Sequence, residues 1–400
     1  MMKSYLIERS REIQPQLVAW RRAIHMHPEL GFEEIQTAAT VAGYLRLLGL
    51  RVKTEIGKTG VLAEFGQGSP TVAIRADMDA LPIYEANEVV YQSKKPGVMH
   101  ACGHDAHTAI AMGAATLLSR EELPGTVRFL FQPAEEVGDE DGISGAPRMI
   151  EDGALEAVDA VLALHVDASK PVGSISIQSG PDSAGVDTFF AVIKGVGGHG
   201  SAPHKVVDPI FLAGHVILVL HGIVSRRMHP FDPAVVSIGT IQGGQATNVI
   251  PEQVTLSGTL RYLEPHVQKL IHAEVERAFQ VSRTLGGDYQ LEFEIGYPPM
   301  INDPGISRLI HTVAAEMLGE ANVLPPEKSM GAEDFGYMTA LSPGAMFTLG
   351  CRIEGDERKH HSPRFDIDEG CLPLGAALLA EMALRFLRNP GSIEPGNKIK

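Results

Sequence analysis

Three observations predict an α/β fold with a mostly parallel central sheet and an inserted domain whose strands and helices follow a different order. In the first and last thirds of the chain, apolar runs of strand length alternate with longer amphipathic stretches, as in sheets built from strand–helix–strand units. The middle third has the order strand, helix, strand, strand, helix, strand, which is the ferredoxin-like pattern. A chain of 400 residues is also long for one hydrophobic core, so two domains are expected.

The first third contains the elements that are expected to build the sheet. An amphipathic pattern that ends at Gly49 predicts a helix over 32–48. Further patterns predict buried strands at 71–74, 127–131 and 160–164 and a helix at 105–118. In parallel sheets, ligands gather beyond the carboxyl ends of the strands. The polar residues that follow these strands are therefore expected to converge: Asp77, Asp79, Glu135, Glu136 and His165.

The middle third is expected to form the inserted domain. Its predicted strands are 187–193, 234–241, 252–262 and 290–295, and its predicted helices are 209–228 and 265–283. Proline- and glycine-containing hinges flank it at 180–182 and 297–299. After the inserted domain the α/β alternation resumes, with predicted helices at 304–318 and 369–387 and a predicted strand at 345–349. We therefore expect a discontinuous catalytic domain, 1–182 and 299–400, interrupted by an inserted domain, 183–298.

Composition narrows the classes of partner and location. The net charge of -15 argues against nucleic acid, because phosphate binding draws mainly on Lys and Arg. The N-terminal residues have no long apolar core, so no signal peptide is expected. The apolar stretch 210–224 is interrupted by two histidines and is short for a membrane span, so no membrane partner is expected. Three scattered cysteines, Cys102, Cys351 and Cys371, suit a reducing cytoplasm, so we expect a cytoplasmic protein.

A loop that contains cysteine and histidine indicates a metal site. Cys102 and His104 flank Gly103, which lets the backbone turn tightly. Glu136, His165 and one of His360 or His361 complete a set of one sulfur, one oxygen and three nitrogen donors. That set is too large for one tetrahedral structural zinc, and it fits two metals about 3.5–4 Å apart. Mn, Zn, Co and Ni all suit these ligands.

Adjacent Glu135 and Glu136 need different roles, because neighbouring side chains of an extended segment point in opposite directions. One would bind metal while the other acts as a general base near a metal-bound water. Two alternatives stay open. Cys102 could be a nucleophile with His104 or His107 as its base, in which case activity would survive a chelator. The protein could also be a non-catalytic metal- or peptide-binding protein, which would hold metal without turnover.

Motifs along nearly the whole chain resemble the amidohydrolase branch of the aminoacylase and carboxypeptidase G metallopeptidase family. This branch includes hippurate hydrolases, N-acyl-amino-acid amidohydrolases and auxin-conjugate hydrolases. The motifs occur in order at 25–30, 75–82, 99–108, 131–136, 198–204, 247–251, 330–335 and 361–365.

The resemblance implies a zinc-peptidase-like catalytic domain with an inserted dimerisation and lid domain, and hence a homodimer. It implies two divalent metal ions and an N-acyl amino acid substrate whose amide bond is hydrolysed; the acyl group stays open. The metal ligands would be Cys102, His104, Glu136, His165 and His361. The reacting groups would be Glu135 as general base, His199 as oxyanion donor to the partner's site, and Asn248 with Arg261 on the substrate carboxylate.

One departure from the family concerns the first metal ligand. The wider family has His-x-Asp where this chain has Asp77-x-Asp79, so the ligand must come from the loop of Cys102 and His104 instead. Asp79 and Asp105 are then expected to orient ligand side chains without binding metal themselves.

Overall fold

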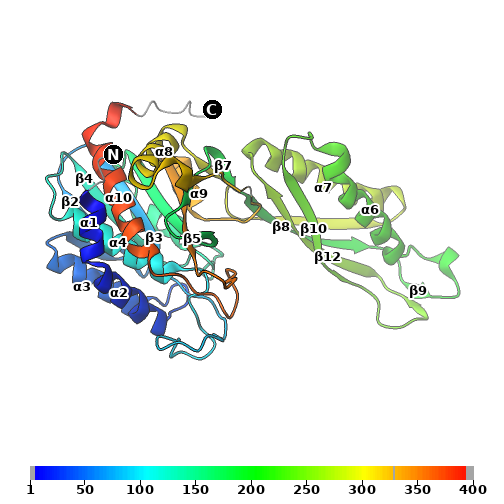
Figure 1. The fold of residues 1–400 in the computed structure, drawn as a ribbon. Coiled ribbons are helices and arrows are strands. Elements are labelled where there is room, and N and C mark those ends of the chain that lie inside the picture. Colours follow the sequence, from blue (N-terminus) through cyan, green and yellow to red (C-terminus); the bar gives the residue numbers. More distant parts are fainter. Residues whose placement is uncertain (1–4, 328, 393–400) are drawn as a thin grey trace. The chain divides into compact units, whose positions relative to one another are not determined.

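The computed structural model describes residues 5–327 and 329–392 and divides the chain into two compact units (Figure 1). Unit 1 contains the described residues of 1–180, 301–327 and 337–400. Unit 2 contains 181–300 and also 329–336, a segment that the sequence assignment left with the catalytic part. Strands β7 (Gly180–Ser183) and β14 (Met300–Asn302) lie where the chain passes between the units.

An eight-stranded sheet forms the centre of unit 1, with the order β1-β2-β4-β3-β5-β16-β6-β15. Its four middle strands run parallel, since β3 pairs in parallel with β4 and β5, and β16 pairs in parallel with β5. The predicted mostly parallel sheet is therefore confirmed. The strand bounds are β1 Arg51–Ile56, β2 Gly60–Gly66, β3 Thr71–Asp77, β4 Thr126–Gln132, β5 Ala160–Pro171, β6 Ile175–Ser176, β15 Val323–Leu324 and β16 Gly344–Arg352.

Helix α4 (His104–Leu118) is the buried axis of unit 1. All of its residues are buried, because its small side chains let α2, α10 and β3 pack closely around it. At Gly113, for example, an added β-carbon would lie 2.6 Å from Leu17 of α2. The other helices of the described chain that contribute residues to unit 1 are α1 Tyr5–Glu12, α2 Gln14–Met26, α3 Ile35–Leu47, α5 Gly145–Glu151, α8 Pro304–Leu318, α9 Phe335–Leu341 and α10 Cys371–Arg388, with short 3-10 turns at Glu320–Asn322 and Pro390–Ser392.

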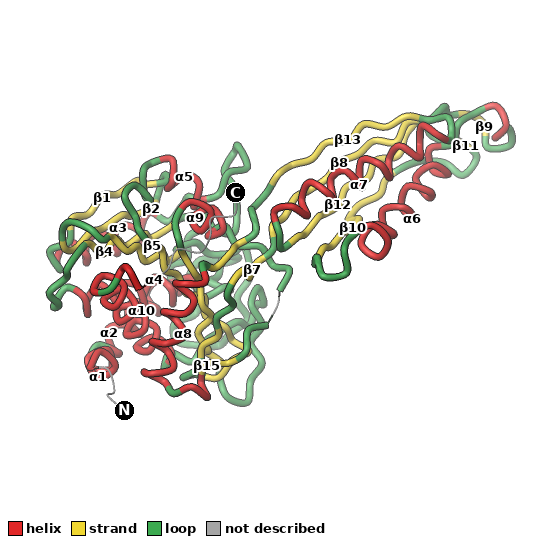
Figure 2. Tube along the Cα trace, turned by 90° about the horizontal axis from the view of Figure 1, so that it is seen from above, coloured by secondary structure: helices red, strands yellow, loops and turns green. Residues whose placement is uncertain are grey.

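Unit 2 follows the order strand, helix, strand, strand, helix, strand, with the antiparallel sheet order β10-β12-β8-β13. Its two helices pack on each other and on the sheet (Figure 2). Alternate residues of β8 and β12 are buried, as expected for a sheet with one covered face. The bounds are β8 Gly185–Lys194, β9 Gly198–His199, α6 Pro209–Arg227, β10 Ala234–Gln242, β11 Val249–Ile250, β12 Gln253–Tyr262, α7 Pro265–Thr284 and β13 Asp288–Ile295, with a 3-10 turn at Pro203–Lys205.

Helix α6 has two apolar faces. In the described part of the chain it is the one helix that is long and apolar enough to cross a membrane by length and composition, a weak criterion that core helices of soluble proteins also meet. One face packs into the core of unit 2 through Leu212, Val216 and Leu220. The other face is exposed in this chain and carries Ile210, Phe211, Leu218, Val219 and Val224. Within the described chain, α6 is therefore covered on one face only.

Candidate metal centre

Five potential metal ligands converge at the carboxyl end of the parallel strands of unit 1. Cys102 and His104 lie at the start of α4, Glu136 follows β4, His165 lies within β5, and His361 follows β16. They form two groups, Cys102 with His104 and His165, and Cys102 with Glu136 and His361. Within each group the ligand atoms lie within 4.8 Å of one another. Cys102 is therefore the candidate ligand that the two groups share.

Gly103 makes the close placement of Cys102 and His104 possible. Its φ of 95° lies in the left-handed region, which residues with a β-carbon rarely adopt. A β-carbon at this position would also lie 2.3 Å from Cγ2 of Val166 in β5. Only glycine therefore fits between the two ligands while α4 begins at His104.

Asp79 fixes the orientation of two ligands at once. Its Oδ1 lies 3.0 Å from Nδ1 of His104, and its Oδ2 accepts the backbone N–H of Glu136 at 3.0 Å. Because an ionised carboxylate only accepts hydrogen bonds, Nδ1 of His104 carries a proton. Nε2 is then the ring nitrogen that can bind a metal. Among the described residues, that buried Nε2 has no hydrogen-bond partner.

The electrostatics of the first donor group favour a cation. Burial raises the pKa of the Cys102 thiol, but His165 and His104 outweigh burial and hold this pKa well below its ordinary value. Burial lowers the pKa of His104, but Asp77 and Cys102 raise it well above its ordinary value. Cys102, whose Sγ lies 3.4 Å from Nε2 of His165, likewise offsets burial and raises the pKa of His165 to about 9. Protons thus compensate the anionic sulfur and Asp77, and a bound metal would release them.

The second donor group sits on strained backbone. His361 has a φ of 58°, and its N–H donates to the carbonyl of Ala101 at 2.8 Å, which ties its loop to the Cys102 loop. Its Nε2 lies 3.0 Å from Oε1 of Glu136, which makes the two side chains an ion pair when His361 is protonated. Cys102 and Glu136 raise the pKa of the half-buried His361 to about 10, and burial raises the pKa of Glu136. Strained residues persist where the surroundings fix them, often at functional sites.

The donor set fits two divalent borderline metals. Nε2 of His104, which has no hydrogen-bond partner among the described residues, belongs to a cluster that combines thiolate, imidazole and carboxylate ligands. His107 is not available as a ligand, because Nδ1 meets Oδ1 of Asp77 at 2.6 Å and Nε2 accepts the N–H of Val166 at 2.9 Å. The same two contacts exclude His107 as the base in the Cys102-nucleophile alternative.

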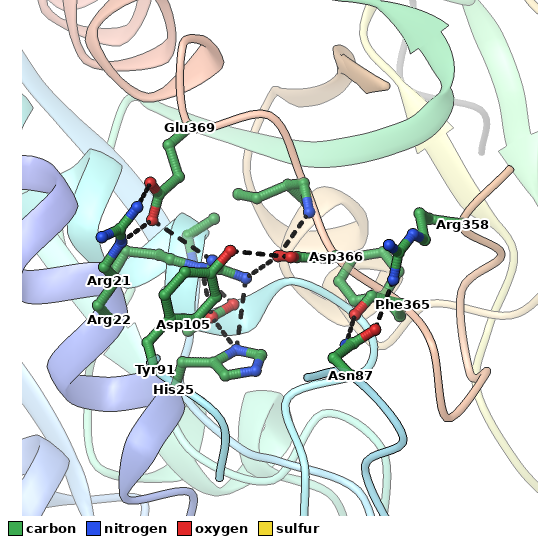
Figure 3. Close-up of polar contacts among 12 residues, drawn as sticks. Arg21, Arg22, His25, Asn87, Tyr91, Asp105, Arg358, Phe365, Asp366 and Glu369 are labelled. Carbon is green, nitrogen blue, oxygen red and sulfur yellow. Dashed lines mark hydrogen bonds and ion pairs between the residues drawn. The ribbon is translucent and has the colours of Figure 1, made fainter. Parts of the chain in front are cut away.

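Asp105 has a different environment from the one expected. It does not orient a metal ligand; instead it joins a buried charge cluster around Arg21, which we call the Arg21 cluster: Arg21, His25, Asp105, Asp366 and Glu369 (Figure 3). Arg21 Nε donates to Asp105 at 2.8 Å, and Nη2 donates to Asp366 at 2.9 Å. His25 lies between two acceptors, Asp105 at 2.7 Å and Glu85 at 3.3 Å, and its pKa is raised because these acids together outweigh burial and Arg21.

The Arg21 cluster connects two of the four segments that carry candidate ligands. Asp105 directly follows His104, and Asp366 lies in the loop that carries His361. Sequence reasoning did not find this cluster. The available signal was the position of Arg21 and His25 on the face of α2 that also buries Leu17 and Ile24.

In unit 2, the structure brings His199 and Asn248 together. β9 pairs with β11 so that His199 faces Val249, and Gly200 N donates to the carbonyl of Asn248 at 2.8 Å. The exposed His199 accepts the N–H of Ser201 at Nδ1, at 3.1 Å. A neutral His199 ring therefore carries its proton on Nε2, where it can be donated to an oxyanion.

Arg261 lies near the end of β12 in the four-stranded sheet, whereas β9 and β11 form a separate two-stranded sheet. Residues 253–261 of β12 separate it from the β9–β11 end, a span of about 26 Å at the rise of a strand (Figure 2). Its Nε donates to Thr259 at 3.2 Å, and no carboxylate of the described chain pairs with it. Burial lowers the pKa of this half-buried guanidinium. The structure therefore does not bring Arg261 and Asn248 together within one copy of unit 2.

Comparisons with known proteins agree with this architecture. A model of peptidase family M20/M25/M40 matches residues 73–385. IAA-amino acid hydrolase ILR1-like 4 of Arabidopsis thaliana is 40% identical over 381 residues, 93% of this chain and 86% of its own. N-acetyl-L-cysteine deacetylase of Bacillus subtilis is 39% identical over 383 residues, 94% of this chain and 89% of its own.

Solved structures give the same result. The Bacillus subtilis YXEP protein, a dinuclear metal binding peptidase from the M20 family, superposes with a TM-score of 0.83 at 35% identity, covering 94% of this chain and 99% of its own. The family resemblance and the α/β class inferred from the sequence are confirmed. The chain therefore belongs to peptidase family M20/M25/M40 and is an amidohydrolase of that family.

Proposed function

We propose that the protein uses two divalent metal ions to hydrolyse the amide bond of N-acyl amino acids. The observation that carries the proposal is the pair of three-donor groups that share Cys102 and lie beside Glu135. Relatives named for the hydrolysis of an auxin–amino acid conjugate and for the deacetylation of N-acetyl-L-cysteine support this substrate class.

The proposed chemistry assigns separate roles to the glutamate doublet. When bound, the metals act as Lewis acids and lower the pKa of the attacking water. Glu136 belongs to a donor group, whereas Glu135 has a carboxylate oxygen within 4.8 Å of ligand atoms of His104 and Glu136. Glu135 takes a proton from the attacking water as the C–O bond forms, and it returns this proton to the nitrogen of the leaving amine as the C–N bond breaks.

Residues of unit 2 are proposed to bind the substrate. His199 donates from Nε2 to the oxyanion of the tetrahedral intermediate, in agreement with the tautomer that Ser201 favours. Arg261 and Asn248 bind the carboxylate of the amino acid, and the absence of a carboxylate partner for Arg261 in the described residues leaves its guanidinium for that role.

Action of Asn248 and Arg261 on one substrate requires two copies of the chain. Asn248 precedes β11, before the start of β12, and Arg261 lies near the end of β12, after about 26 Å of strand that a small carboxylate cannot span. We therefore propose a homodimer formed through unit 2. Two features of unit 2 support it: the exposed apolar face of α6, and the edge strand β10, which carries no charged residue. The opposite edge, β13, carries Asp288, Glu292 and Glu294, which discourage strand pairing.

Glu135→Gln tests the central assignment. We expect this variant to keep both metals by elemental analysis while kcat falls at least a thousandfold, because Gln cannot accept the proton. Glu136→Gln should instead lose metal, and Glu140→Gln, on the exposed loop, should behave as wild type. Turnover near wild type in Glu135→Gln with metal retained would overturn the role of Glu135.

A chelator distinguishes the proposal from a cysteine nucleophile. We expect EDTA to abolish turnover and Mn, Zn, Co or Ni to restore it. Turnover that survives removal of all metal would support nucleophilic Cys102 instead. A panel of N-acetyl, benzoyl and indole-acetyl amino acids then identifies the acyl group.

A further inference from the structure

Glu34 is a buried carboxylate that reaches the segment of the glutamate doublet. It occupies the N-cap position of α3, yet its side chain does not cap that helix. Glu29 accepts the N–H groups of Gln36 and Thr37 at 3.0 and 2.9 Å instead. The carboxylate of Glu34 is therefore directed away from its own helix.

The partners of Glu34 lie on two other segments. Oε1 accepts the backbone N–H of Ala134 at 2.8 Å, and Oε2 accepts the hydroxyl of Thr59 at 2.5 Å. Glu34 is fully buried, and burial raises its pKa to about 7, against the opposing effect of the hydrogen bond from Thr59. Burying a carboxylate is costly unless its hydrogen bonds compensate for the lost water.

Ala134, which donates its N–H to Glu34, has an unfavourable backbone conformation. Its φ of 45° is left-handed although it has a β-carbon, and it directly precedes Glu135. Its carbonyl accepts the N–H of Gly145 at 2.8 Å. A β-carbon on Gly31 would lie 2.9 Å from the β-carbon of Ala134, so the loop that leads to Glu34 packs directly on this turn.

The conformation at Ala134 decides where the doublet points. The chain bends at Glu135 and Glu136, directly after the left-handed Ala134, so this turn sets the directions in which both glutamate side chains leave the backbone. Asp79 accepts the N–H of Glu136 at 3.0 Å, which fixes the second residue of the doublet. Glu34 accepts the N–H of Ala134, the residue that precedes the doublet.

We propose that Glu34 is a positioning residue for catalysis: by holding the N–H of Ala134, it fixes the strained turn that directs Glu135 to the reacting atoms while Glu136 faces the metal ligands. The inference rests on the proposed function, which assigns the proton transfer to Glu135. Glu34 itself touches no reacting atom.

Three substitutions at Glu34 separate positioning from general stability. Glu34→Gln keeps an oxygen for Ala134 and offers N–H to the Thr59 hydroxyl, so kcat should stay within threefold of wild type. Glu34→Leu removes the acceptor, so kcat should fall at least thirtyfold while KM and metal content stay within threefold and twofold of wild type. Glu34→Asp keeps the acid but withdraws its oxygens by about 1.5 Å, one C–C bond, so kcat should fall at least tenfold even if the Leu variant does not fold.

Glu29→Leu is the matched control. It removes the buried carboxylate that accepts the N–H groups of the first turn of α3 but leaves the contact of Glu34 with Ala134 in place. We expect a lower Tm with kcat within threefold of wild type. An equal loss of kcat in Glu29→Leu and Glu34→Leu would overturn the inference, because loosening of α3 would then explain both.

Hydrogen exchange in the metal-free protein gives a readout that does not depend on activity. The peptide that contains the Ala134 amide should exchange at least tenfold faster in Glu34→Leu or Glu34→Asp than in wild type, and at the wild-type rate in Glu34→Gln and Glu29→Leu. If wild type hydrolyses no N-acyl amino acid, the proposed function is wrong. Hydrogen exchange still tests whether Glu34 fixes the backbone at Ala134. If wild type is active and the Leu or Asp variant matches its kcat, the positioning role alone is wrong.

Discussion

Replacing Arg21 by Met should destabilise unit 1 strongly. The Arg21 side chain has no solvent exposure and contacts Asp105 at 2.8 Å and Asp366 at 2.9 Å. Methionine fills similar space but leaves these buried carboxylates without their counter-charge. Removing one partner of a buried ion pair typically costs about 3–5 kcal/mol. This is a large part of the about 5–15 kcal/mol by which a domain is normally stable.

The single tryptophan of the chain provides the assay. Trp20 precedes Arg21 on α2 and lies against Tyr44, with 4.4 Å between ring centroids, so its fluorescence reports the unfolding of unit 1. With a denaturant slope of about 3 kcal/mol/M in urea, the midpoint of the metal-free protein should fall by about 1–2 M at pH 7.

Arg22→Met is the matched control. Arg22 pairs with Glu369 at 2.6 Å, but 38% of its side chain is exposed, and exposed pairs contribute about 0.2–1 kcal/mol. Its midpoint should move by at most about 0.3 M on the same slope. Equal shifts for Arg21→Met and Arg22→Met would refute the argument that burial of the cluster determines its contribution.

The difference between wild type and Arg21→Met should also depend on pH. Burial raises the pKa of Asp105, but Arg21 and His25 outweigh burial and hold this pKa well below its ordinary value. A depressed carboxyl pKa stabilises the fold above the unfolded value of about 3.9, and this stabilisation is lost as the pH falls through the folded value. In the variant, protonation below about pH 4 relieves the uncompensated carboxylate, so the difference in midpoint should shrink there.

Three further outcomes are expected. Asp79→Asn should weaken metal binding about tenfold to a hundredfold by calorimetry, because a ligand imidazole loses the carboxylate that orients it; unchanged affinity would contradict that role. Iodoacetamide should alkylate Cys102 in the metal-free protein and spare it in the loaded protein, as mass spectrometry of the Cys102 peptide would show; equal labelling would mean that its sulfur is not a ligand. Charged residues placed on the exposed face of α6, as in Leu218→Glu, should yield a monomer in sedimentation with both metals retained; an unchanged dimer would place the interface elsewhere.

The sequence predicted the parts of the fold that depend on local periodicity. The strands around β3, β4 and β5 and the helices α4, α6, α7 and α8 all have apolar patterns of the right period, and their predicted bounds lie close to the observed ones. Strand β5 is an instructive exception. It continues to Pro171, so His165 lies inside the strand and not after it, because the later residues alternate in burial and lack a continuous apolar run.

Contacts between distant segments could not be predicted in the same way. Arg21 meets Asp105 and Asp366, and Glu34 meets Ala134, across separations in the chain that no periodic pattern records. The structure brings the five candidate ligands together. In the sequence, these five were identified from the order of the family motifs, because residue spacing alone did not decide between His360 and His361 as a ligand. Nε2 of His360 faces the N–H of Ala168 at 3.4 Å, a contact that only the folded chain reveals.

Sharing one sulfur between the two donor groups leaves the centre without redundancy. Each group holds three candidate ligands, and Cys102 is the member that they have in common. Oxidation of this sulfur to a sulfinic acid would leave each group with two of its three donors, and that step is irreversible for most proteins. Damage to this one atom would therefore affect both donor groups at once, and metals bound to the sulfur would compete with peroxide for it.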